Sequence, residues 1–182
     1  MRPRDQLFLF PELDNFKTII KNIDYVDVST LVDPNPNHSK LNFYNEIEKD
    51  TFFIYKTGHI NSFRPELGRI FPYIKNEKTG KLLKLGLSKH YLRASINVQK
   101  KTHHSSNSHS CVVDLKMHRI AALAFIENRD PKKLTLVDHK NGDRLDYSVE
   151  NLRWVDYSGN NTGVSKPRNQ NWEETLIKKG VV

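Results

Sequence analysis

The sequence predicts an α+β protein in which a basic antiparallel β-sheet module is followed by a unit of strand, loop, strand and helix. Two observations carry this prediction. Between residues 51 and 116, short apolar runs are separated by polar turns, a pattern typical of antiparallel strands. Further on, the apolar runs 134–139 and 152–157 flank a polar loop that contains Asn141-Gly142, which indicates a second strand pair.

Alternating apolar and polar residues, separated by segments typical of turns, define the module at 51–116. The expected strands lie in TFFIYKTGHINSF, GRIFPYI, YLRASINVQKK and CVVDLK, with a turn at KNEKTGK and a polar loop at KKTHHSSNSHS. In the third run, Leu92, Ala94, Ile96 and Val98 alternate with Tyr91, Arg93, Ser95 and Asn97. Successive side chains of a strand point to opposite faces, so we expect one buried face and one polar, basic face.

The segments around this module give simpler patterns. Residues 1–50 are expected to form a separate helical or irregular unit, because NFKTIIKNI (15–23) has helical spacing and LVDPNPNHSK (31–40) is typical of a linker. MHRIAALAFIEN (117–128) predicts a helix that ends at the Asp130-Pro131 step, and residues 166–182 predict a tail with a short helix. No role for residues 1–50 follows from their sequence.

Positive charge is concentrated in the middle of the chain, whose net charge is +8. Residues 51–120 hold thirteen Lys or Arg against three Asp or Glu. Such a concentration attracts polyanions, so double-stranded DNA is the expected partner, and a solvated basic face without a partner is the alternative. The candidate DNA-binding residues are Arg93, Lys100, Lys101, Arg119, Lys140 and Arg153. For Arg119, simple burial in the helix is an equal alternative.

Composition limits the class of protein. The 182 residues suffice for one medium domain or two small ones. The single cysteine, Cys111, excludes an intramolecular disulfide, and the apolar run LFLF near the start is too short for a signal peptide or a membrane span. We therefore expect an intracellular protein that is not secreted, has no membrane partner and is a monomer.

Four polar residues between positions 138 and 160 form the candidate site. Asp138 and His139 end the first strand of the C-terminal unit, Asn151 lies twelve positions after His139, and Asn160 lies nine positions further on. In an order of strand, loop, strand and helix, the end of the first strand can face the start of the helix. We therefore expect all four side chains to meet at one small site.

These residue types suit the hydrolysis of a phosphodiester. A hard divalent ion such as Mg²⁺ or Mn²⁺ takes oxygen ligands, which the carboxylate of Asp138 and the amide of Asn160 can supply. Neutral His139 can take a proton from the attacking water. Asn151 can accept a hydrogen bond from the second imidazole nitrogen and so select the tautomer. For any one of these residues, an ordinary strand end or turn would be explanation enough.

The motifs VDHKNG, ENLRWVDYSGNN and MHRIAALAFIEN together resemble those of the HNH nucleases of the ββα-metal fold, particularly phage and viral homing endonucleases. The resemblance covers about residues 117–162 and implies an HNH core at 117–165. It implies a DNA endonuclease with Asp138 and Asn160 on a single Mg²⁺ or Mn²⁺, His139 as general base and Asn151 orienting that base. As a monomer with one site, such an enzyme would nick DNA. YKTGHINSF and LRASINVQKK are similar to the DNA-binding module found ahead of such cores.

Two features depart from the family pattern. The family loop often has Gly-Asn followed shortly by another Asn, whereas here Gly142 is followed by Asp143 and then Asp146. Carboxylates beside a phosphate would repel it unless they turn away or help to hold the ion. Asn161 adjoins Asn160, so either residue is a candidate for the metal ligand on the helix.

Two rival interpretations come from other classes of protein. One is a DNA-binding protein that keeps the fold without catalysis. The other is a zinc-stabilised binding module whose ligands would come from His103, His104, His109, Cys111 and His118. The irregular spacing of these residues and the lack of a C-x-x-C partner argue against zinc.

Overall fold

The structure, a computed structural model, describes residues 18–35, 52–56, 70–101 and 108–161. For residues 97–101, 108–111, 160 and 161, only the backbone is described. Its elements are β1 (Tyr25–Asp27), η2 (Val28–Thr30), β2 (Phe52–Tyr55), β3 (Tyr73–Asn76), β4 (Leu85–Ser88), β5 (Tyr91–Lys101), β6 (Ser108–Lys116), α1 (Met117–Phe125), β7 (Leu136–His139), η5 (Val149–Asn151), β8 (Leu152–Val155) and α2 (Tyr157–Asn161). The mixture of antiparallel sheets with few helices confirms the α+β class.

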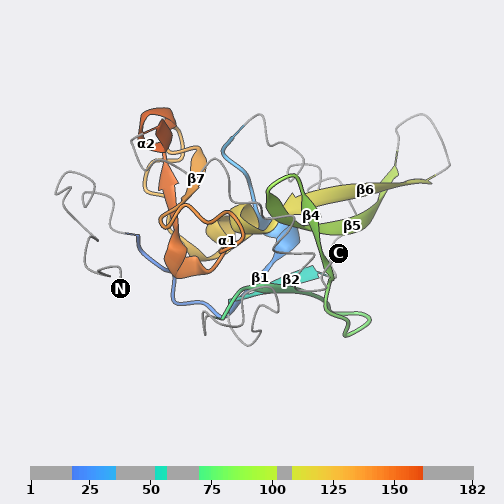
Figure 1. Cartoon of the computed structure of the whole chain (residues 1–182). Helices are drawn as coiled ribbons and strands as arrows, with labels where there is room; N and C mark the ends of the chain where they lie inside the picture. Colours follow the sequence, from blue (N-terminus) through green and yellow to red (C-terminus); the bar gives the residue numbers. More distant parts are fainter. Residues whose placement is uncertain (1–17, 36–51, 57–69, 102–107, 162–182) are drawn as a thin grey trace, which may run out of the picture.

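Three antiparallel sheets surround the central helix α1. They have the strand orders β1-β2-β3, β4-β5-β6 and β7-β8. In Figure 1, α1 lies in the middle, with β4, β5 and β6 on one side, β7 and α2 on the other, and β1 and β2 below. A single cluster of buried apolar side chains, with members such as Ile54, Leu92, Ile120 and Trp154, connects all three sheets through α1.

The sheet of β4, β5 and β6 has the two faces that the alternation predicts. Leu92, Ala94 and Ile96 are buried, whereas Ser95 is exposed. On β6, Val113 and Leu115 are buried and stand opposite Ile96 and Ala94 in register. The apolar face of this sheet therefore covers one side of α1, and β6 leads directly into the helix.

Helix α1 ends earlier than its sequence pattern predicts. The expected helix extended to residue 128, but Ile126 is already extended and forms an isolated bridge with Ile20. Two backbone hydrogen bonds secure this bridge, from Lys21 N to the Phe125 carbonyl (2.7 Å) and from Glu127 N to the Ile19 carbonyl (2.9 Å). Pairing with a second chain segment therefore replaces the last turn of the predicted helix.

The same bridge corrects the prediction for the N-terminal segment. Of the helix expected at 15–23, residues 15–17 lie outside the described residues, and 18–23 form no helix. Ile19 and Ile20 are β-branched and favour extended backbone, and here their peptide groups bond to the end of α1. Further along, β1 pairs with β2 in register Val26↔Ile54, across the boundary predicted at residue 50. The division into 1–50, 51–116, 117–165 and 166–182 itself stays a prediction.

The predicted strand pair of the C-terminal unit is confirmed. β7 and β8 are antiparallel, with Asp138 opposite Arg153 and His139 opposite Leu152. The turn after β7 contains Gly142 at φ 74°, where glycine is favoured because it lacks a Cβ atom, and Gly142 N donates to the His139 carbonyl (2.9 Å). Helix α2 follows β8 directly, so the order of strand, loop, strand and helix is present.

Several expected features lie outside the described residues. They are the strand continuation at 57–63, the tip of the polar loop at 102–107, which contains His103 and His104, and the tail at 166–182. Within the described ranges, the structure contains no helix that is both long enough and apolar enough to cross a membrane.

Candidate active site

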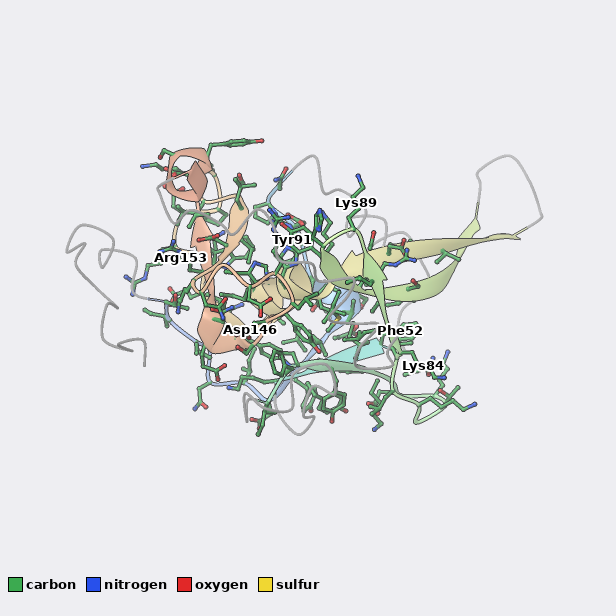
Figure 2. The ribbon with its side chains drawn as sticks, in the orientation of Figure 1. Phe52, Lys84, Lys89, Tyr91, Asp146 and Arg153 are labelled. Atoms are coloured by element: carbon green, nitrogen blue, oxygen red, sulfur yellow. The ribbon has the colours of Figure 1, made fainter. Side chains whose placement is uncertain are left out.

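A pocket of about 210 Å³ opens where β5, α1, β7 and the β7–β8 loop meet. Its lining residues are Tyr91, Lys116, His118, Arg119, Leu136, Val137, Asp138, His139, Gly142 and Arg144. Two of the four predicted site residues, Asp138 and His139, therefore line the same pocket. Figure 2 labels Tyr91, which lines the pocket, and Asp146 and Arg153, which do not.

Strand β7 positions Asp138 and His139 at its end, where consecutive side chains point to opposite faces. His139 is 6% exposed, and its ring centroid lies 5.0 Å from that of His118 and 6.0 Å from that of Tyr91. The imidazole is thus held in a group of three rings that come from β7, α1 and β5. Its burial limits the contact of the imidazole with bulk water, and the role of His139 as general base stays a prediction.

On the other face of β7, Asp138 forms an ion pair with Arg153. Oδ2 of Asp138 accepts from Nη2 (2.8 Å) and Nε (3.1 Å) of Arg153. The two side chains are 10% and 20% exposed, so this pair is largely shielded from solvent. Arg153 was predicted to contact DNA, and here its guanidinium neutralises the carboxylate that was predicted to bind metal.

Asn151 holds the β7–β8 loop. Its Oδ1 accepts from Asn141 N (3.1 Å), and its Nδ2 donates to Asn141 Oδ1 (2.9 Å) and to the Asp146 carbonyl (2.7 Å). Lys140 N also donates to the Asn151 carbonyl (2.8 Å). Through these contacts, Asn151 holds the loop that follows His139. Its role in selecting the imidazole tautomer stays a prediction.

The two unusual carboxylates of the loop are engaged within it. Asp146 is fully buried and accepts from the Ser148 hydroxyl (2.6 Å) and from Asn141 Nδ2 (2.7 Å). Asp143 Oδ1 accepts from Leu145 N (3.0 Å). Of the two alternatives, the structure therefore favours carboxylates that turn away from the pocket, because neither residue is among its lining residues.

Lys140 follows His139 and lies outside the pocket. Its Nζ donates to the Glu150 carbonyl (2.7 Å). The residue as a whole is exposed, but desolvation of its ammonium group lowers the pKa of Lys140, and the positive charge of Arg153 lowers it further. A DNA contact by Lys140 stays a prediction.

Arg119 is buried, which supports the burial alternative for this residue. Its guanidinium forms a bidentate ion pair with Asp33, donates to the Thr135 carbonyl (2.9 Å) and stacks over Trp154 at 5.5 Å from the ring centroid. Its side chain is 5% exposed and that of Asp33 is 0% exposed. This corrects the expected phosphate contact, because the guanidinium is already committed to a buried carboxylate.

The remaining DNA-binding candidates lie on the long β5 strand. Arg93 forms an ion pair with Asp114 on β6, and Ser95 donates to the same carboxylate (2.7 Å). The side chains of Lys100 and Lys101 lie outside the described part of the structure. Arg93 therefore helps to pair the two strands, and its contact with DNA stays a prediction.

Sequence reasoning missed two cationic residues and an aromatic residue of the pocket. Nζ of Lys116 lies 5.3 Å from the ring centroid of Tyr91, and Cζ of Arg144 lies 5.5 Å from it. The His118 ring is also close to Tyr91, at 4.6 Å between centroids. The sequence could have indicated two of these pocket residues. His118 lies at the start of the predicted helix, and Arg144 lies between the two site motifs. Nothing local marked Tyr91, which is one of eight alternating residues in its strand.

Helix α2 is positioned by Asp156. Oδ1 of Asp156 accepts from Gly159 N (2.7 Å) and from the Ser158 hydroxyl (2.8 Å), and these bonds lower the pKa of the Asp156 carboxyl. A Cβ atom on Gly159 would lie 3.2 Å from Oδ1, so the glycine leaves room for this cap. The side chains of Asn160 and Asn161 lie outside the described residues, and the choice between them stays open.

The side chains present are compatible with a hard divalent ion at Asp138. Asp138 is among the lining residues of the pocket, and oxygen ligands are those that Mg²⁺ and Mn²⁺ prefer. Among the described residues, no three His, Cys, Asp or Glu side chains are grouped as a metal site would require, so the further ligands would come from α2, water and substrate. His118 of the zinc hypothesis packs against Tyr91 and His139. The side chains of His109 and Cys111 are not among those described.

Comparison with known proteins identifies two similar viral proteins, both from Acanthamoeba polyphaga mimivirus. One is 35% identical over 112 residues, which cover 59% of this chain and 25% of the relative. The other is 37% identical over 89 residues, which cover 48% of this chain and 23% of the relative. Both are named uncharacterized HNH endonucleases.

This similarity supports the HNH resemblance inferred from the motifs. The matched part spans about a quarter of the length of these curated relatives. No protein-family model matches the chain, and no solved structure matches it. The names of the relatives imply a nucleic-acid substrate for those proteins, and the activity of this chain is a separate question.

Proposed function

We propose that this chain carries the site of an HNH-type endonuclease that hydrolyses phosphodiester bonds in double-stranded DNA. One observation carries the proposal. Asp138 and His139 end β7 inside a pocket whose lining has three cationic side chains, Lys116, Arg119 and Arg144, and a single acidic one. A base beside a carboxylate in a cationic pocket suits attack on a phosphodiester, whose own charge repels anionic nucleophiles.

His139 takes the role of general base in this proposal. A neutral imidazole accepts a proton near neutral pH, and the ring group with His118 and Tyr91 keeps it in one place. The loop that Asn151 and Asn141 hold together begins directly after His139 and forms one wall of the pocket through Gly142 and Arg144. Asn151 thus supports the base through the loop, whichever tautomer the ring adopts.

A single Mg²⁺ or Mn²⁺ would be held by Asp138 and by Asn160 or Asn161 of α2. When bound, the ion supplies positive charge to the phosphate oxygens as the transition state forms. Asp156 fixes the start of α2 directly after β8, and β8 places Arg153 opposite Asp138. Because the chain has one such Asp-His pair at the end of β7, a monomer would cut one strand in each event. The enzyme would act inside a cell, and a role in homing is compatible with the motifs.

Conversion of supercoiled plasmid at pH 8 tests this function. The parent chain is assayed with Mg²⁺, Mn²⁺ or EDTA beside His139→Ala, with His90→Ala in the exposed β4–β5 turn as a matched control. We expect metal-dependent nicked circles from the parent and from His90→Ala, and none from His139→Ala. Nicking by His139→Ala at the parental rate would exclude His139 as the base. Linear DNA as the first product would exclude nicking by a monomer.

A DNA-binding protein without catalysis is the second candidate, and the ion pair between Asp138 and Arg153 favours it. An arginine on the proposed metal ligand is the arrangement expected if no ion is ever bound there. This candidate predicts that the parent shifts labelled duplex DNA on a gel and that His139→Ala shifts it equally well. It also predicts no cleavage with either metal, including on a mixture of DNA sequences that contains rare sites.

A further inference from the structure

We propose that Arg144, Lys116 and Tyr91 form a second anion site beside His139, which binds a phosphate group of the substrate strand next to the one that is cut. This inference rests on the proposed nuclease function and adds a subsite to it. None of these three residues belongs to the set of Asp138, His139, Asn151 and Asn160 on which the chemistry depends.

The subsite is assembled from three separate elements around one ring. Tyr91 is the first residue of β5, Lys116 is the last residue of β6, and Arg144 lies in the β7–β8 loop. Both cationic groups lie over the Tyr91 ring, Nζ of Lys116 at 5.3 Å and Cζ of Arg144 at 5.5 Å from its centroid. An aromatic face attracts cations, so the Tyr91 ring favours the placement of both cationic groups at this end of the pocket.

The charge balance of the pocket favours an anionic ligand. Its lining has three cationic side chains, of which Arg119 is already neutralised by buried Asp33. The one acidic lining residue, Asp138, is neutralised by Arg153. Arg144 therefore adds positive charge to the pocket that neither of these two ion pairs uses, and an anionic phosphate group would be attracted to it.

The chemistry of Arg144 makes phosphate the best anion for this site. Its planar guanidinium can give two parallel hydrogen bonds to two phosphate oxygens, and contact with an aromatic face leaves its N–H edge available for them. Among the described residues, Arg144 makes no salt bridge, whereas Arg119 and Arg153 each hold a carboxylate. Arg144 is thus the arginine of the pocket to which we assign the phosphate contact.

The loop keeps Arg144 in place. Asp143 Oδ1 accepts from Leu145 N (3.0 Å), and Leu145 and Asp146 on the C-terminal side of Arg144 are buried. Asn151 anchors the same loop through Asn141 and the Asp146 carbonyl. Because the backbone beside Arg144 is held by these contacts, little backbone entropy remains to be lost when Arg144 binds phosphate.

Binding of a labelled DNA duplex in EDTA, measured by fluorescence anisotropy over a range of salt concentrations, tests the subsite without cleavage. Arg144→Gln is compared with Lys132→Gln, which removes the same charge at an exposed position outside the pocket. We expect about tenfold weaker binding for Arg144→Gln and a log–log salt slope that is shallower by about 0.9, as for the loss of one phosphate contact. Lys132→Gln should bind like the parent.

Three further variants separate the contribution of the Tyr91 ring from that of the Arg144 charge. Tyr91→Phe keeps the aromatic face and should bind like the parent, whereas Tyr91→Leu should weaken binding, because the two cationic groups lose their platform. Arg144→Lys keeps the positive charge but loses the planar guanidinium with its two parallel donors. It should therefore keep the salt slope of the parent and lose part of its affinity for duplex DNA. Thermal unfolding of each variant shows whether its fold is retained, and Arg144→Lys carries the test if Tyr91→Leu is unfolded.

The outcomes distinguish the subsite from the nuclease function. If the parent nicks plasmid but Arg144→Gln binds duplex with the affinity and salt slope of Lys132→Gln, the subsite is wrong and the nuclease function stands. If Arg144→Gln binds duplex more weakly and with a shallower salt slope, as expected, but the parent never cleaves, the subsite is supported. The protein would then bind DNA without cutting it. If the parent binds no duplex at low salt, both are overturned.

Discussion

Asp138 and Arg153 face each other in register across β7 and β8, with Nη2 of Arg153 at 2.8 Å from Oδ2 of Asp138. The strand pair thus brings the proposed metal ligand and a permanent positive charge into direct contact. A divalent ion and a guanidinium compete for the same carboxylate, because each is stabilised by its negative charge. Binding of metal must therefore displace Arg153 from Oδ2 or leave it as a repulsive neighbour.

Arg153→Gln should strengthen the binding of Mn²⁺ in the absence of DNA. Removal of the competing charge is expected to lower the Kd about fivefold, which corresponds to roughly 1 kcal/mol at a partly exposed site. Titration of free Mn²⁺ by electron paramagnetic resonance measures this without any cleavage. Arg153→Lys, which keeps the charge, is the control and should bind Mn²⁺ like the parent. Unchanged affinity in Arg153→Gln would show that the two cations do not compete.

Asn151→Ala should destabilise the protein through the loop. The substitution leaves the buried Asp146 carbonyl and the Asn141 side chain without their donor, at a cost of about 2–4 kcal/mol in the free energy of unfolding. Urea unfolding measures the loss, and Asn128→Ala, in a more exposed turn, should lose only about 1 kcal/mol. In a double-mutant cycle, Asn141→Ala and Asn151→Ala should not be fully additive, because both remove the hydrogen bond from Asn151 Nδ2 to Asn141 Oδ1. Full additivity would contradict this loop network.

Asp33→Ala should destabilise the protein more strongly than any surface substitution. It leaves the Arg119 guanidinium charged, buried and without its carboxylate, which typically costs about 3–5 kcal/mol. The double variant Asp33→Leu with Arg119→Met removes both charges and should recover most of this loss in urea unfolding. A loss below about 1 kcal/mol for Asp33→Ala would mean that the pair is as weak as an exposed one.

Asp156→Ala should show a dependence of stability on pH that reports the cap of α2. The cap lowers the pKa of the Asp156 carboxyl in the folded protein, so its contribution is complete above the unfolded value near 3.9 and is lost as the pH falls through the folded value. The difference in Tm between the parent and Asp156→Ala should therefore be constant from pH 5 to 7 and shrink toward pH 3. Asp156→Asn keeps an uncharged cap, so its Tm should exceed that of Asp156→Ala throughout.

Local patterns in the sequence were sufficient for the elements that carry the site. The alternation around Leu92 and Ala94, the Asn141-Gly142 turn and the pairing of β7 with β8 follow from periodicity and turn chemistry, which act within a few residues. Strand β1 is three residues long, which is too short for a period to be recognised. The helix at 117 was expected, but its end at Phe125 depends on Ile20, about a hundred positions away, which no local pattern contains.

The same limit applies to the site. Spacing in the sequence brought Asp138 and His139 together correctly in one pocket, because both belong to one strand. The contacts of His139 with His118 and Tyr91, and of Arg119 with Asp33, join residues from separate elements, and only the packing of three sheets around α1 decides them. The loop carboxylate of Asp146 was ambiguous for another reason: its burial depends on partners on both sides of the turn.

Helix α1 is fastened at both ends by the segment before residue 36, through the Asp33 ion pair at its first turn and the bridge between Ile20 and Ile126 just past its last residue. These contacts join residues 86 or more positions apart, and chains rich in such distant contacts fold slowly. His118, at the start of this helix, forms part of the pocket, so the pocket requires contacts that span residues 20–144. A partly synthesised chain would therefore lack the complete pocket, and we expect the pocket to form only in the last step of folding.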